Sequence, residues 1–194
     1  MKGAREMMGS KASIIAGGNQ GNREEHDFYP TPPNATESIL KLEKLNGSIY
    51  ECACGDGAIS KVLKEFYPNQ PVFSSDLIDR GYGNVGIDFL TFDYMGKKFD
   101  NIITNPPYRF ATEFVKRALS MSNEKVLMLL KIQFLEGNKR QELFRNSPLK
   151  KVYVFSKRLN INKNGIGTKN STMICFAWFV WDKNYAGKPE IDWV

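Results

Sequence analysis

Short apolar runs alternate with stretches of mixed polarity along this chain. Runs rich in β-branched and aromatic residues predict strands at 48–53, 71–75, 84–87, 98–104, 125–130, 150–155 and 172–182. The stretches between them predict helices at 34–46, 58–67, 109–122 and 136–146. Because strands and helices alternate, we predict a doubly wound α/β sheet, with the predicted strand 125–130, which is apolar from residue 126 onward, near its centre.

Length and composition favour one folded domain. The chain has 194 residues and 42% hydrophobic content, enough to bury a substantial core. We predict a mobile leader at 1–25, where glycine and asparagine cluster, and a single domain at 26–194. No apolar run is long enough to cross a membrane, and the first residues lack a signal-like apolar core. The three cysteines show no metal or disulfide spacing, which favours the cytoplasm and no metal site.

The motif Asn105-Pro106-Pro107-Tyr108 follows the predicted strand 98–104. Pro106 has no N–H and restricts Asn105 to extended geometry, so the strand must end there. The turn lies at the carboxyl end of a strand, where open α/β sheets bind ligands. Its amide and carbonyl oxygens and its aromatic ring suit a flat ring that carries an amine. The alternative is an ordinary proline-rich turn with a half-buried tyrosine.

A glycine turn follows the first predicted strand. Gly55 and Gly57 would let the backbone approach a ligand, and Glu51 can accept a hydrogen bond from an ammonium or hydroxyl group. The glycine patterns of triphosphate and dinucleotide sites are absent. A tight turn without a ligand would show the same glycines.

Two further acidic residues end the next predicted strands. Asp76 closes the second strand, where a carboxylate can bind two ribose hydroxyls. Asp88 and Phe89 come at the end of the third. A single acid is more often a turn or cap residue, but three acids at successive strand ends favour a binding site.

In this order of motifs the chain resembles the S-adenosylmethionine-dependent adenine-N6 DNA methyltransferases, most closely the small phage or prophage type. The segments 27–33 and 176–182 are similar to the opening and closing segments of these enzymes, so the likeness covers about 27–183. It implies a seven-stranded, mostly parallel sheet with an antiparallel last strand. It also implies that 26–194 is a methyltransferase domain without a separate target-recognition domain, hence low or short sequence specificity.

The resemblance assigns roles to individual residues. Asn105 and the carbonyl of Pro106 would bind the target amine, and Tyr108 would stack on a base flipped out of DNA, with Pro107 completing the catalytic loop. The residues implied to bind S-adenosylmethionine are Tyr29, Thr31, Glu51, Gly55, Asp56, Gly57, Asp76, Asp88 and Phe89. Cys52 and Cys54 are expected to be small packing residues.

The chemistry needs little more than these groups. The adenine amine is a weak nucleophile, and two fixed acceptors on its hydrogens would stabilise the charge that develops during attack. No general base is required first, and His26, the only histidine, lies outside the motifs. Cytosine-C5 chemistry would need a cysteine in the 105–108 loop, which has none.

Basic residues concentrate downstream of this loop. Residues 131–170 contain ten Lys or Arg and two Glu, a net charge of +8, whereas the whole chain carries +6. This concentration favours a polyanion partner such as DNA, although solvated surface charge is the common alternative. The residues expected to contact DNA lie in the 156–171 loop, namely Lys157, Arg158, Lys163 and Lys169.

Other substrates share the same loop. Adenine in ribosomal or transfer RNA and a glutamine amide in a protein also present a planar nitrogen. The basic region argues against a protein substrate, and the glycine turn and the 28–33 segment favour DNA by resemblance alone. A non-catalytic nucleic-acid-binding module that kept the fold is the alternative from a different class.

Overall fold

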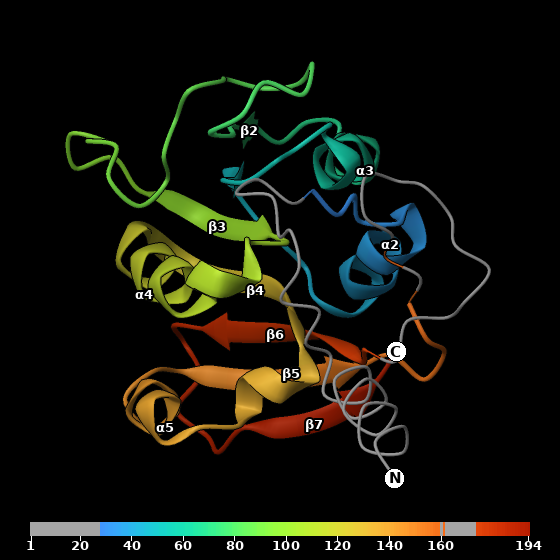
Figure 1. Cartoon of the computed structure of the whole chain (residues 1–194), viewed down its shortest axis with the longest axis vertical. Coiled ribbons are helices and arrows are strands. Elements are labelled where there is room, and N and C mark those ends of the chain that lie inside the picture. The colour runs from blue at the N-terminus through green and yellow to red at the C-terminus, as the bar shows by residue number, and fades with distance from the viewer. Residues whose placement is uncertain (1–27, 160, 162–173) are drawn as a thin grey trace, which may run out of the picture.

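A computed structural model describes residues 28–159, 161 and 174–194. The predicted leader, His26, Lys163 and Lys169 lie outside these residues. The described strands form one seven-stranded sheet of order β2-β1-β3-β4-β6-β5-β7 (Figure 1). Their bounds are β1 Ile49–Glu51, β2 Val72–Ser74, β3 Phe99–Thr104, β4 Ser122–Lys131, β5 Leu149–Val154, β6 Phe176–Asp182 and β7 Glu190–Trp193.

Strand β4 lies at the centre of the sheet, as its apolar run predicts. It pairs in parallel with β3 and antiparallel with β6. Residues 126–130 are all buried, because helices cover both faces of the sheet at this point. The prediction of a doubly wound α/β sheet of seven strands is therefore confirmed.

Four α-helices form the outer layers in the described part of the chain, namely α2 Pro33–Leu42, α3 Ala58–Phe66, α4 Ala111–Met121 and α5 Asn138–Arg145. Helices α2 and α3 cover one face of the sheet, and α4 and α5 cover the other (Figure 1). Successive residues of β4 serve the two cores in turn, since Val126 and Met128 pack towards α4 while Leu127 packs towards α2 and α3. Short 3-10 helices, η1 Tyr108–Phe110 and η2 Ile132–Leu135, follow β3 and β4.

One predicted strand is wrong, and one observed strand was not predicted. Residues 84–87 form no strand, because a single bridge between Ser75 and Asn84 is their only ladder contact and Gly86 adopts a positive φ of 74°. Instead β7 completes the seven strands by pairing in parallel with β5 at the edge of the sheet. The strand predicted at 172–182 is β6, which is antiparallel to both of its neighbours as the resemblance implies, and β7 follows it in the chain.

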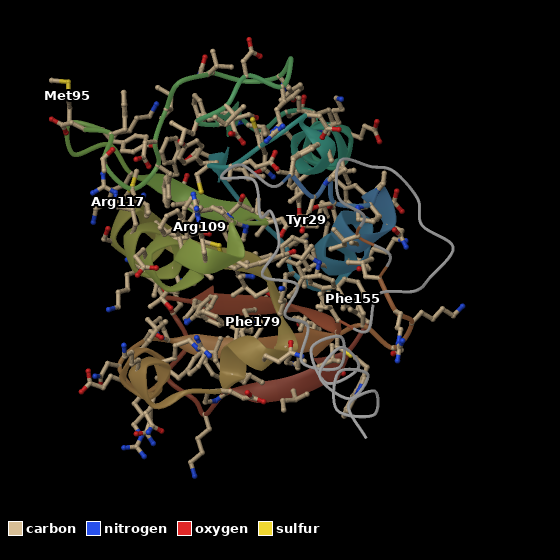
Figure 2. All side chains as sticks on the ribbon, viewed as in Figure 1. Tyr29, Met95, Arg109, Arg117, Phe155 and Phe179 are labelled. Carbon is tan, nitrogen blue, oxygen red and sulfur yellow. The ribbon has the colours of Figure 1, made fainter. Side chains whose placement is uncertain are left out.

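The segment between β2 and β3 is mostly irregular. It carries Met95, which is 90% exposed and lies at the tip of a projecting loop (Figure 2). No helix in the described ranges has the length and apolar character needed to traverse a lipid bilayer.

Candidate active site

A cavity of about 550 Å³ opens at the carboxyl ends of β1, β2 and β3. This is the edge of the sheet where the sequence motifs predict a ligand. Twelve of the predicted site residues line it, namely Tyr29, Thr31, Glu51, Gly55, Asp56, Asp76, Asp88, Phe89, Asn105, Pro106, Pro107 and Tyr108. Gly57 is the one member of the predicted cofactor and catalytic sets that does not.

The glycine turn joins β1 to α3. Gly55 has φ of 54°, and its N–H donates to Asp76 Oδ2 at 2.8 Å. A side chain at Gly55 would overlap the ring of Phe28, which lies across the turn. Gly57 has φ of 80° at the start of α3, and a Cβ there would lie 2.5 Å from the ring of Tyr82. Gly57 is thus required by the turn and by Tyr82, whereas the resemblance implies contact with a ligand.

Glu51 is a buried carboxyl group in the wall of the cavity. The hydroxyl of Ser60 donates to Glu51 Oε2 and lies 2.6 Å from the hydroxyl of Ser74. Burial, together with the negative charges of Asp76 and Asp56, raises the pKa of Glu51 well above its ordinary value. This environment therefore favours the protonated, neutral form of Glu51.

Replacing Glu51 by Gln should stabilise the protein at alkaline pH when no ligand is added. A raised pKa means that the folded state binds more protons than the unfolded state, so the contribution of Glu51 to the stability of the wild type falls as pH rises above about 4.5. Gln does not titrate and still accepts from Ser60, so we expect a gain of about 1–3 kcal/mol at pH 8 that disappears towards pH 4.5. Thermal melts of both proteins between pH 4.5 and 8 measure it; a difference that stays constant across this range would contradict the prediction.

The two acids beyond β2 are held by backbone groups. Asp76 Oδ1 accepts from the N–H of Ile78 at 2.9 Å, in addition to the bond from Gly55. Asp88 accepts from the N–H of Leu90 at 2.9 Å and the hydroxyl of Thr91 at 3.0 Å. Each carboxylate oxygen has a further lone pair, so both acids keep acceptor capacity towards the cavity.

Phe89 lies deeper than the predicted role suggests. Its ring is buried and packs on Phe114, with a centroid distance of 5.1 Å, and on Tyr50 at 6.1 Å. It forms part of the cavity wall and part of the core beneath α4.

Asn105 is fixed by residues 28–31, which we call the strap. Its Nδ2 donates to the carbonyl oxygen of Tyr29 and to Oγ1 of Thr31, both at 3.1 Å. Figure 2 shows Tyr29 near the end of β3, which ends at Thr104, the residue before Asn105. A backbone carbonyl can only accept, so the nitrogen of the amide must face the strap. The amide oxygen Oδ1 therefore remains as the acceptor that Asn105 can offer to a ligand.

Tyr108 is more enclosed than a free stacking platform. Its ring lies 6.2 Å from the ring of Tyr29 and 5.8 Å from that of Phe176, and Lys131 Nζ lies 5.0 Å from its centroid. Burial raises the pKa of Tyr108 above its ordinary value, so the phenol is neutral. Stacking on a base would have to use the part of the ring that these neighbours leave open to the cavity.

Several cavity residues were not singled out from the sequence as site residues. They are Phe28, Arg80, Arg109, Phe110 and Lys131. The guanidinium of Arg80 lies 4.4 Å from the ring of Phe28, and that of Arg109 lies 4.5 Å from the ring of Phe110. Lys131 ends β4 at the same edge of the sheet as Asn105, and Arg109 directly follows the Asn105–Tyr108 motif. Both positions can be read from the sequence, so Lys131 and Arg109 could have been predicted to lie near the site.

The predicted nucleic-acid contacts lie apart from the cavity lining. Lys157 and Arg158 are exposed and follow β5, and neither lines the cavity. Two of the ten basic residues are neutralised locally: Lys150 pairs with Glu43 and Asp182, and Lys151 pairs with Glu190 and Asp192. The basic surface is therefore smaller than the sequence count suggests.

The cysteines of the turn are buried packing residues, as predicted. Cys52 and Cys54 are both free thiols. Burial is the main cause that raises the pKa of Cys54 to about 12, which keeps the thiol protonated. Within residues 28–159, 161 and 174–194, no cluster of three His, Cys, Asp or Glu residues could hold a metal ion.

Comparison with protein-family models and with curated proteins gives no match. Solved structures do match. A protein from Pyrococcus horikoshii described as an RNA methyltransferase aligns over 91% of this chain and 98% of its own, with a TM-score of 0.61 and 16% identity. A methyltransferase from Pyrococcus furiosus aligns over 92% of this chain and 98% of its own, with a TM-score of 0.52 and 19% identity.

The modification subunit of a protein from Vibrio vulnificus described as a type I restriction enzyme is also similar. It aligns over 95% of this chain with a TM-score of 0.59 and 15% identity, and this chain spans 48% of its length. At these identities the likeness establishes the architecture. The chain therefore has the Rossmann-like fold of class I methyltransferases, with its cavity at the carboxyl edge of the sheet.

Proposed function

We propose that this protein transfers a methyl group from S-adenosylmethionine to the exocyclic N6 amine of adenine in DNA. The observation that carries the proposal is one cavity that joins four acidic residues at one part of its lining to Asn105 and Tyr108 at another. The acidic part suits a cationic cofactor, and the Asn105 corner suits a planar amine.

The acidic residues fit the parts of S-adenosylmethionine. Glu51 is the buried acceptor for the ammonium group, and the cation would lower the pKa of this carboxyl and release its proton. Asp76 closes β2 and would hold the ribose hydroxyls, while Asp88 and Phe89 would face the adenine ring. When bound, the sulfonium supplies an electrophilic methyl group.

Asn105 and Pro106 would act on the acceptor amine. The amide oxygen and the Pro106 carbonyl would accept hydrogen bonds from its two hydrogens and stabilise the positive charge that develops on the nitrogen. Because the strap fixes the amide of Asn105, the acceptor needs no reorganisation during the reaction.

Charge around the cavity favours a nucleic acid. Arg80, Arg109 and Lys131 line it, and cations at such positions would attract the phosphates that flank a flipped base. Lys157 and Arg158 would extend these contacts over the exposed surface after β5. This distribution argues against a glutamine side chain as the acceptor, since a protein amide has no need of surrounding cations.

RNA is the second candidate, because adenine in RNA presents the same amine. Among the similar structures, one is described as an RNA methyltransferase and another as part of a restriction enzyme, so both nucleic acids must be tested.

The decisive experiment offers three acceptors in parallel. The protein is incubated with labelled S-adenosylmethionine and one acceptor at a time: unmethylated DNA, ribosomal and transfer RNA, or a bulk protein extract. Nucleoside and amino-acid analysis then identifies which acceptor carries the label. We expect N6-methyladenine in DNA. Label in RNA or in protein alone would refute the DNA assignment, and no transfer together with no cofactor binding in calorimetry would refute the function. Mapping the methylated positions would also test the predicted low sequence specificity.

A further inference from the structure

We infer that Thr31 is a positioning residue that sets the orientation of the Asn105 amide, so that the strap belongs to the catalytic corner. The sequence resemblance places Thr31 at the cofactor, and in the structure its hydroxyl also accepts a hydrogen bond from Asn105 Nδ2. The inference rests on the proposed function only for the identity of the reaction.

The two hydrogen-bond acceptors of the Asn105 amide differ in whether a substitution can remove them. The Tyr29 carbonyl accepts at 3.1 Å whatever side chain residue 29 carries. The Thr31 hydroxyl, also at 3.1 Å, is the side-chain partner and can be removed by substitution. Thr31 is 4% exposed, so water cannot readily replace its hydroxyl.

The orientation matters because the two ends of an amide are opposite in character. With the nitrogen held by the strap, Asn105 presents an acceptor to the cavity. Rotated by 180°, it would present a donor, which would repel the hydrogens of an amine and would aim its oxygen at the Tyr29 carbonyl. Loss of the Thr31 bond leaves one hydrogen bond to oppose this rotation, so the competent orientation becomes less populated.

The strap is itself held in place at three points. The ring of Phe28 packs against the glycine turn at Gly55, and the guanidinium of Arg80 lies over that ring. The ring of Tyr29 contacts Tyr108, and α2 begins at Pro33, directly behind Thr31 and Pro32. These contacts hold the Thr31 hydroxyl and the Tyr29 carbonyl at fixed positions relative to the end of β3.

The test compares Thr31→Val with Thr31→Ser, which keeps the hydroxyl. We expect Thr31→Val to lower kcat by about tenfold, the effect of one hydrogen bond, while the calorimetric Kd for S-adenosylmethionine changes by less than about threefold. Thr31→Ser should stay within about threefold of wild-type kcat. Thr36→Val is a matched control, because Thr36 is buried on α2 and its hydroxyl has no partner among the described residues.

A spectroscopic readout makes the inference independent of activity. The side-chain amide signals of Asn105, assigned by their loss in Asn105→Ala, should shift and exchange faster with solvent in Thr31→Val, and should be unchanged in Thr36→Val. If the signals do not move, the inference is wrong even if activity falls. If cofactor binding and kcat fall by the same factor, Thr31 is a cofactor ligand and the inference is also wrong. A wild type that methylates no acceptor would refute the proposed function, and the amide signals would still decide the role of Thr31.

Discussion

Asn105→Ala should lower methyl transfer by about 10²–10³-fold while leaving the affinity for S-adenosylmethionine within about threefold of wild type. The substitution removes the acceptor that would stabilise charge on the target amine. The acidic residues of the cavity, which would bind the cofactor, keep their own hydrogen bonds to Ser60, Gly55 and Leu90. Single-turnover rates with excess enzyme, together with calorimetry of cofactor binding, separate the two effects.

Asn105→Ala also removes two hydrogen bonds to the strap, so stability must be measured in parallel. We expect a cost of about 1–3 kcal/mol. The matched control is Asn123→Ala, since Asn123 is exposed near the beginning of β4, does not line the cavity, and its side chain donates to Asp100. Full activity in Asn105→Ala would support the alternative of a binding module that kept the fold.

The apolar pattern predicts the central strands well because burial on both faces leaves little choice of residue. Residues 126–130 of β4 and 176–181 of β6 are continuous apolar runs, and helices cover the sheet on each side. The same reasoning predicts the location of the site. The carboxyl ends of parallel strands meet at one edge, so motifs at 51–57, 76 and 105–108 had to converge.

At the edges of the sheet, the pattern of apolar residues does not predict the strands correctly, because edge strands are defined by backbone pairing and not by burial. Residues 84–87 have strand-like composition but only a single bridge to Ser75. Strand β7 is exposed along its whole length and is defined by its backbone pairing with β5 and by Glu190 and Asp192 beside Lys151. The composition of a short segment gives no information on which distant residues the segment will pair with.

Contacts between residues far apart in the sequence also change the role that an individual residue plays. The net charge of 131–170 cannot show that Lys150 and Lys151 pair with acids elsewhere in the chain. Nor can the sequence show that Thr31 bonds to Asn105, 74 residues later. Both facts arise when separate elements are brought together by the fold.

Glu43→Gln should destabilise the protein by about 3 kcal/mol at pH 7, which corresponds to a fall in Tm of about 6–12 °C. Glu43 is 2% exposed and lies just after α2. Its Oε2 accepts from Lys125 at 2.7 Å and Lys150 at 3.2 Å, and Oε1 accepts from the Tyr153 hydroxyl at 2.9 Å. The substitution leaves two ammonium groups beside a neutral amide, and breaking a buried ion pair in this way is costly.

The pH dependence identifies charge as the cause. Burial alone would raise the pKa of Glu43, but hydrogen bonds from Lys125 and Tyr153 and the charges of both lysines outweigh it and lower the pKa. A lowered pKa contributes stability that is fully present above about 4.5 and is lost as pH falls through the folded value, so the two melting curves should converge in acid.

Glu65→Gln provides the control, because Glu65 is exposed and such a surface change should stay within about 0.5 kcal/mol. If the difference for Glu43→Gln persisted unchanged down to pH 3, lost packing and not lost charge would explain it. Convergence would instead show that an ion pair between Glu43 and Lys125 links the first half of β4 to the end of α2.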